Sequence, residues 1–264
     1  MASIAETGET MSVGNVFSRG FGVIIDNPTT VFGIAFLFGA VPSVALSWFQ
    51  QHMLGFARDE YTVLGSLAVM LAVLLINLVI QAFVQGCLVR ATLAYTRGER
   101  ATFAESAGAS IAVLLPLVAL AIVIGVSVIV GLMFILVPGV ILYVIWSVAS
   151  PALVAERMGV FGALGRSRFL TKGARWKVFG IEFILVIAYY IFLAALGAVT
   201  LSVTGANLTS AIASSNFLMG WIVVSVITST VINTVWSTVQ TSLYVELRNW
   251  KEGMPEQSLA EIFA

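Results

Sequence analysis

Charged residues are scarce in this sequence. They make up 10% of the 264 residues, against roughly 25% in an ordinary soluble domain. Apolar residues make up 59% of the chain even before its 23 glycines are counted. So few polar side chains could not cover a surface that faces water. The composition excludes a soluble globule and a disordered chain, and it predicts an all-α integral membrane protein.

Residues that build metal and catalytic sites are scarce too. The single cysteine, Cys87, has no partner for a disulfide, and the single histidine, His52, has no second histidine to share a metal. The sequence contains no His-Glu-x-x-His zinc motif, no Gly-x-Ser-x-Gly nucleophile motif and no glycine-rich phosphate loop. We therefore predict that the chain is not an enzyme and has no catalytic residues, no metal site and no cofactor.

Two further absences concern partners and targeting. The 13 basic and 13 acidic residues balance, so no general attraction to nucleic acid is expected. The first residues are acidic and lack a basic start followed by an apolar run, so no cleavable secretory signal is predicted.

Long apolar runs are what the sequence does contain. A helix needs about 20 apolar residues to cross a bilayer. Six runs meet or approach this length and predict six membrane-spanning helices within one membrane domain, 1–264: about 29–50, 62–89, 110–135, 139–154, 177–203 and 218–246.

The third and fourth spans form one apolar stretch, 110–154, which is about twice as long as a bilayer requires. Because Pro-Gly is a turn-forming pair, Pro138 and Gly139 predict a tight turn between two antiparallel helices. The alternative is one long kinked or re-entrant helix.

The basic residues predict the orientation of these spans. Lysine and arginine near span ends are retained on the cytoplasmic side of a membrane. Twelve of the 13 lie in the N-terminal segment, in the loops after spans two and four and in the C-terminal tail, whereas the alternate loops hold only Arg58. Both termini are therefore predicted to be cytoplasmic.

A pattern recurs along the chain. Residues 31–36 (VFGIAF) match residues 178–183 (VFGIEF), and Gln85 matches Gln240 in the second helix of each hairpin. The recurrence predicts three parallel repeats, each an amphipathic interfacial segment followed by a helical hairpin. The segments lie at about 12–25, 99–109 and 158–170. The first either lies in the headgroup plane or packs beneath the helices without touching lipid.

Polar residues inside the spans form a first candidate site. Glu182 is the one acid clearly inside a predicted span, and such acids are costly to bury in a membrane. Two stripes at helical spacing accompany it in spans two and six: Asn77, Gln81, Gln85, Asn233 and Gln240. These residues either hold helices together, with Glu182 paired to a base such as Arg175, or line a wet groove between spans two, five and six.

The basic loop 157–177 forms a second candidate site, because six bases at a cytoplasmic interface attract anionic lipid headgroups. The predicted lipid or phosphate contacts are Arg166, Arg168, Lys172, Arg175 and Lys177. The alternative is that these residues serve only to retain the loop in the cytoplasm.

Several residues in 137–183 form a pattern of prolines, glycines and basic positions: Val137-Pro138-Gly139-Val140, Trp146, Pro151, Glu156, Gly159, Ala163-Leu164, Ser167 and Thr171-Lys172-Gly173. This pattern resembles the membrane module of bacterial glycerophosphoryl diester phosphodiesterases and related free-standing six-helix inner-membrane proteins. The resemblance implies a bacterial cytoplasmic-membrane protein without catalysis of its own. In fused members that chemistry belongs to a separate soluble domain, for which residues 249–264 leave no room.

Two functions are predicted as alternatives. The first is a non-enzymatic membrane protein that interacts with lipids, with a membrane protein partner or with a second copy of itself through its basic cytoplasmic surface. The second is a transporter or lipid-handling protein that uses the polar groove. Against the second, no span is visibly broken at matching positions of two halves of the sequence, which would be the best sequence indication of a binding site. An intramembrane enzyme is a weaker third alternative.

Overall fold

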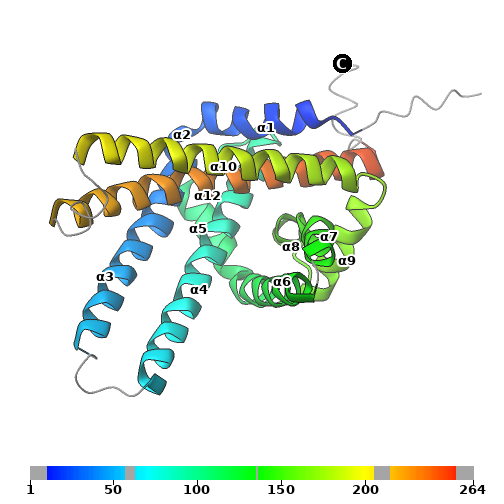
Figure 1. Cartoon of the computed structure of the whole chain (residues 1–264). Coiled ribbons are helices and arrows are strands. Elements are labelled where there is room, and N and C mark those ends of the chain that lie inside the picture. The colour runs from blue at the N-terminus through cyan, green and yellow to red at the C-terminus, as the bar shows by residue number, and fades with distance from the viewer. Residues whose placement is uncertain (1–10, 57–62, 135, 205–214, 254–264) are drawn as a thin grey trace, which may run out of the picture.

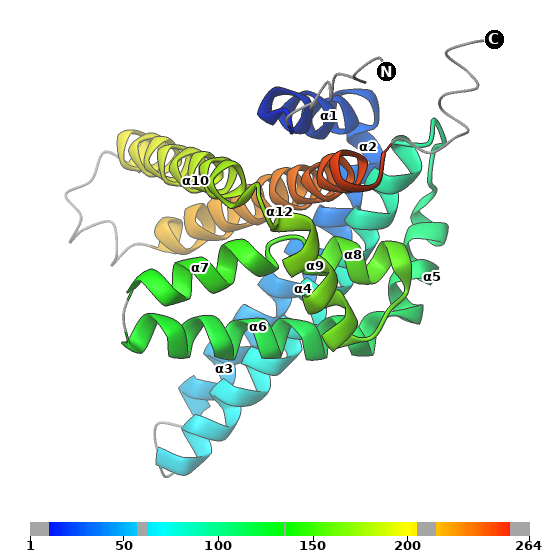
Figure 2. The same cartoon turned by 90° about the vertical axis from the view of Figure 1, so that its right-hand side faces the viewer.

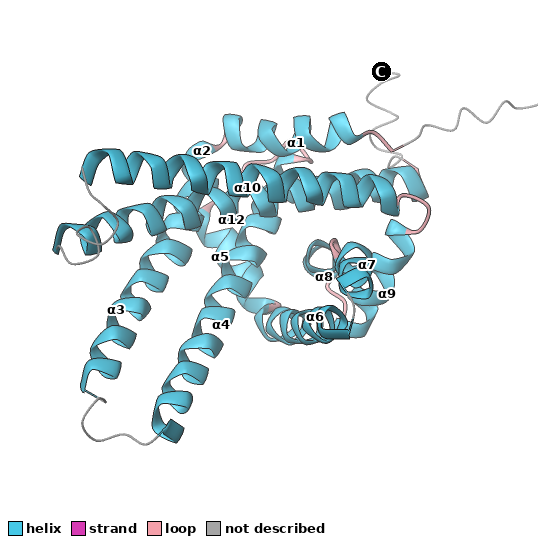
Figure 3. Ribbon diagram, viewed as in Figure 1, coloured by secondary structure: helices cyan, strands magenta, loops and turns pink. Residues whose placement is uncertain are grey.

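The computed structural model describes residues 11–56, 63–134, 136–204 and 215–253 (Figure 1). Within these ranges the regular structure is helical, with no strand (Figure 3). Six stretches are long and apolar enough to cross a membrane: Pro28–Gln50, Gly65–Tyr95, Leu114–Met133, Val137–Glu156, Arg175–Val199 and Ile222–Glu252. The prediction of an all-α membrane protein with six spans is confirmed.

A short helix followed by a hairpin occurs three times along the chain. The first unit is α1 (Val13–Asp26), α2 (Pro28–Ile34), the π-helical segment η1 (Ala35–Ala40), α3 (Val41–Phe56) and α4 (Val63–Tyr95). The second is α5 (Phe103–Ala112), α6 (Leu114–Phe134), α7 (Leu136–Trp146) and α8 (Ala149–Glu156). The third is α9 (Val160–Thr171), α10 (Arg175–Thr204) and α12 (Ser215–Glu252). The three predicted interfacial segments correspond to α1, α5 and α9.

The three hairpins diverge in different directions from a common base (Figures 1 and 2). By the base we mean the short helices α1, α5, α8 and α9, the N-terminal thirds of α6 and α10, and the C-terminal halves of α4 and α12. Fully buried apolar side chains gather there: Leu88, Leu120, Leu153, Leu170 and Leu243. The distal halves instead expose large apolar side chains, as helices surrounded by lipid do: Leu74, Ile129, Met133, Ile191 and Val223.

Helix length explains how the base and the hairpins are joined. The 38 residues of α12 are about 57 Å long at 1.5 Å per residue, whereas the hydrocarbon layer is about 30 Å thick. One helix can therefore cross the bilayer with its N-terminal half and pack in the base with its C-terminal half.

Helix α1 packs against α12, while its Phe21 and Ile25 side chains stay exposed; contact of this helix with lipid therefore stays a prediction. Val16, Gly20 and Val23 are buried, and a Cβ on Gly20 would lie 3.1 Å from a methyl group of Val239. Glu246 of α12 reinforces the contact because its carboxylate accepts a hydrogen bond from the Ser12 N–H at 3.2 Å.

Within the long apolar stretch 110–154 the chain is split into two neighbouring helices, α6 and α7, as predicted. The predicted position of the turn between them is wrong. Pro138 and Gly139 lie in the first turn of α7, where a proline is tolerated because its missing N–H would be unpaired there anyway. Residue 135, which separates the two helices, lies outside the described ranges. The third span also begins later than predicted, at Leu114, because α5 extends to Ala112.

Two spans are interrupted, but not at matching positions: one is the first helix of its hairpin and the other is the second. The first contains η1, and the fourth is broken at residues 147–148, between α7 and α8. A proline follows each interruption: Pro42 and Pro151. Proline has no N–H to offer the carbonyl four residues earlier, and its ring collides with that carbonyl. Those carbonyls belong to Phe38 within η1 and to Ser147 at the break.

Candidate functional site

The predicted basic loop 157–177 folds into α9 and the first turn of α10. Gly173 makes the reversal between them with φ +92°, a backbone conformation that favours glycine. Ser167 and Thr171 on α9 donate hydrogen bonds to the carbonyl of Ile145 at 2.7 and 3.4 Å. They therefore hold α9 against the break after α7, where helical carbonyls have lost their usual partners.

Arg166 is occupied by two carboxylates. Its Nε donates to Glu156 Oε1 at 2.8 Å, and one of its terminal nitrogens lies 2.5 Å from Glu252 Oε1. The hydroxyl of Tyr244 donates to the same Glu156 oxygen at 2.7 Å. The hydrogen bond to Glu252, together with that to Glu156, raises the pKa of Arg166 above its ordinary value. This cluster ties α9 to α8 and α12.

Three other predicted contacts are exposed: Arg168, Lys172 and Arg175. Their side chains form no ion pair or hydrogen bond with any part of the chain that the structure describes. Lys177 differs, because its Nζ donates to the carbonyl of Met11 at 2.8 Å. The five predicted bases thus divide into two that bond to other parts of the chain and three that do not.

Exposed aromatic rings occur on the same two helices, α9 and α10, as the exposed bases. Trp176 is 86% exposed and packs edge-on against Phe179, which is followed along α10 by Phe183. Phe169 is half exposed, and its ring has Arg166 and Lys251 at 5.8 and 5.9 Å from its centre. Tryptophan is enriched at the membrane–water boundary. We call Arg168, Phe169, Lys172, Arg175 and Trp176 the basic–aromatic surface.

Glu182 lies inside the base and is 3% exposed. Its carboxylate accepts hydrogen bonds from the Tyr143 hydroxyl at 3.0 Å and from the Gln240 amide at 3.3 Å. Gln240 in turn accepts a hydrogen bond from the Gln85 amide at 3.4 Å. These four residues, which we call the polar hub, come from α10, α7, α12 and α4. The hub therefore joins all three hairpins.

The hub corrects the prediction that Glu182 pairs with a base, and it supports the prediction that polar side chains hold helices together. Glu182 has no basic partner within the described residues, and Arg175 does not reach it. Gln85 and Gln240 form a hydrogen bond between helices. Asn77 does not, because its amide donates to the carbonyl of Val73 in its own helix at 3.2 Å.

The structure does not extend the hub to every residue of the two polar stripes. Gln81 and Asn233 are half-buried, and no interhelical hydrogen bond joins them within the described ranges. The missed member is Tyr143. Its signal was a hydroxyl in the middle of an apolar span, which needs a partner when buried.

In the described ranges, no group of three or more His, Cys, Asp or Glu side chains could hold a metal ion. No protein-family model, curated protein or solved structure matches the chain. The resemblance of residues 137–183 to the phosphodiesterase membrane module stays a prediction.

Proposed function

We propose that the protein is a non-enzymatic module of a bacterial cytoplasmic membrane that binds anionic lipid headgroups through its basic–aromatic surface. The observation that carries the proposal is that three exposed bases, Arg168, Lys172 and Arg175, have no acidic partner among the described residues. Exposed Trp176 directly follows the last of them. Exposed bases without an acidic partner are suited to bind the phosphate groups of anionic lipids.

The position of the surface along the chain supports this function. Arg175 is the first residue of the span Arg175–Val199, so its side chain and that of Trp176 belong at the level of the headgroups. Each base near an anionic surface contributes about 1 kcal/mol. Three bases therefore provide about 3 kcal/mol, which corresponds to about a hundredfold in affinity.

The test is the preference for phosphatidylglycerol over phosphatidylcholine among lipids that co-purify from bilayers containing both. Replacing Arg168, Lys172 and Arg175 by Gln should reduce this preference by about ten- to a hundredfold. High salt should weaken it in the unmodified protein, because exposed charges are screened. The matched control replaces Arg90, Arg97 and Arg100 by Gln, which removes the same charge elsewhere. An equal loss in the control, or none in the first variant, would contradict the proposal.

The proposed orientation, with both termini cytoplasmic, has its own test. In a Cys87→Ser background, Arg168→Cys should react with a membrane-impermeant thiol reagent from the cytoplasmic side alone. Gly205→Cys, in the connection 205–214 outside the described ranges, should react from the opposite side alone. Reaction of both from one side would rule out the six-span topology.

The alternative, transport or lipid handling through a polar groove, is favoured by the two interrupted spans and the buried carboxylate of Glu182. Interrupted helices are common where membrane proteins bind substrates. Against this alternative, the hydrogen bonds of Glu182 go to Tyr143 and Gln240, both protein side chains. A carboxylate satisfied in this way favours helix packing.

A further inference from the structure

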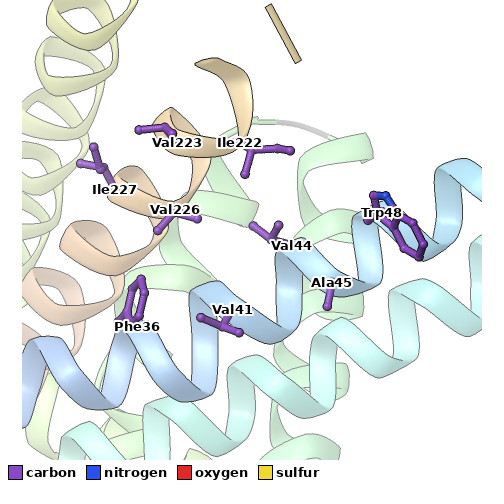
Figure 4. Close-up of a pocket in the computed structure, with 9 residues that line it drawn as sticks. All are labelled: Phe36, Val41, Val44, Ala45, Trp48, Ile222, Val223, Val226 and Ile227. Atoms are coloured by element: carbon purple, nitrogen blue, oxygen red, sulfur yellow. The ribbon is translucent and has the colours of Figure 1, made fainter. Parts of the chain in front are cut away.

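An apolar groove separates the distal half of the first hairpin from that of the third (Figure 4). Its volume is about 630 Å³, and small-molecule pockets commonly enclose about 300–1,000 Å³. Side chains of the first span and of α12 approach one another across it: Phe36, Val41, Val44, Ala45, Trp48, Ile222, Val223, Val226 and Ile227.

The first span packs closely against two other helices just before the groove. In η1, Gly39 is buried, and a Cβ there would lie 3.3 Å from a methyl group of Val84 and 3.9 Å from the amide nitrogen of Asn233. The span is therefore packed closely against α4 and α12 at that level. Pro42 follows directly and prevents regular helical hydrogen bonding to Phe38. Such π-helical insertions frequently mark functional sites.

The position of the groove restricts what fills it. Both of its walls belong to candidate membrane spans, Pro28–Gln50 and Ile222–Glu252, so the groove opens toward hydrocarbon. Apart from the indole of Trp48, every lining side chain is purely apolar. Water and polar solutes would find almost no hydrogen-bonding partner there.

A helix from a second copy of the chain is a poorer fit than a lipid chain. Helices associate in membranes through small residues that allow close backbone approach, or through hydrogen bonds between polar side chains. Of the nine lining residues, Ala45 alone is small. A thin, flexible and wholly apolar occupant fits this lining best.

We propose that this groove binds one acyl chain of a membrane lipid. The proposal goes beyond the proposed function, because the groove lies on the first span and α12 whereas the basic–aromatic surface lies on α9 and α10. It involves apolar contact with a chain and no recognition of a headgroup.

The test uses the full chain in bilayers of phosphatidylcholine that carries a photoreactive diazirine near the end of one acyl chain. Crosslinks in the unmodified protein should concentrate in both walls, at residues 41–48 and 222–227. Filling the groove with Ala45→Phe and Val226→Phe should reduce them several-fold. The matched control, Leu71→Phe and Leu74→Phe, enlarges exposed apolar residues of α4 outside the groove and should leave them unchanged.

Two results would overturn the proposal. One is equal labelling of the groove in the filled and unmodified proteins. The other is a dimer, crosslinked through the groove, that filling dissociates, which would assign the groove to a second copy of the chain. If the double variant does not fold, the single variant Val226→Phe provides the same comparison. Because phosphatidylcholine is neutral overall, replacing Arg168, Lys172 and Arg175 should not affect the labelling. The two proposals can thus fail separately.

Discussion

Replacing Arg166 by Gln is expected to lower the free energy of unfolding by about 2 kcal/mol. The guanidinium bridges Glu156 on α8 and Glu252 on α12. Its loss leaves the partly buried carboxylate of Glu156 without a cation, whereas Glu252 keeps its ion pair with Arg248 at 3.3 Å. Hydrogen bonds to charged groups contribute about 1.5–3 kcal/mol. The measurement is denaturant-induced unfolding in detergent micelles, followed by near-ultraviolet circular dichroism.

Arg168→Gln is the matched control for this prediction. The same substitution two residues further along α9 removes an exposed base that has no partner among the described residues, so stability should change by less than about 0.5 kcal/mol. The preference for anionic lipid should fall in Arg168→Gln and not in Arg166→Gln, since only Arg168 belongs to the basic–aromatic surface. Equal losses of stability in the two variants would show that the ion pairs of Arg166 contribute little.

Replacing Gly131 by Ala is expected to lower the free energy of unfolding by about 1–3 kcal/mol, the usual cost of an overpacked contact. A Cβ on Gly131 would lie 2.9 Å from the Cα of Gly139 on α7. Because that neighbour is backbone, no side chain can rotate away, and α6 and α7 must separate. The same unfolding measurement applies.

Gly125→Ala on the same helix provides the comparison. A Cβ at Gly125 meets nothing within 4 Å, so this variant should gain up to about 1 kcal/mol from the better helix propensity of alanine. The two substitutions are chemically identical and six residues apart. If both stabilise the protein, the close approach of α6 and α7 does not constrain it.

Three prolines show how far the fold could be predicted. The six spans follow from the lengths of apolar runs, which need no knowledge of tertiary structure. The effect of a proline depends on whether helix precedes it. Pro138 and Pro151 each lie in the first turn of a helix, α7 and α8, whereas Pro42 follows the π-helical segment directly. The dipeptide Pro138-Gly139 predicted a turn because Pro-Gly favours turns. The two residues alone do not show whether a helix begins just before them.

The candidate site was predictable where its residues share one face of a single helix, as the polar stripes do. Gln85 and Gln240 were predicted to hold helices together and do pair in the hub. Glu182 was predicted to pair with a base or to line a groove, and it instead accepts hydrogen bonds from Tyr143 and Gln240. Tyr143 was missed because it lies 39 residues before Glu182 on another hairpin, whose direction no local pattern specifies.

The different roles of Arg166 and Arg168 follow from helical geometry. Residues two apart on a helix point to nearly opposite sides, so one faces the base and the other faces outward. The prediction for loop 157–177 grouped all its bases together and therefore missed the difference between Arg166 and Arg168.

The polar hub also has a consequence for the order in which the chain enters the membrane. Glu182 precedes Gln240 by 58 residues, and ribosomes add about 5–20 residues per second, so about 3–12 s separate their synthesis. During that interval Tyr143 and Gln85 have already been made, and the Tyr143 hydroxyl is the hub donor available to the Glu182 carboxylate. In order of synthesis, the second hairpin thus provides the first hub donor for Glu182, and the last helix provides the Gln240 that links the hub to the first hairpin.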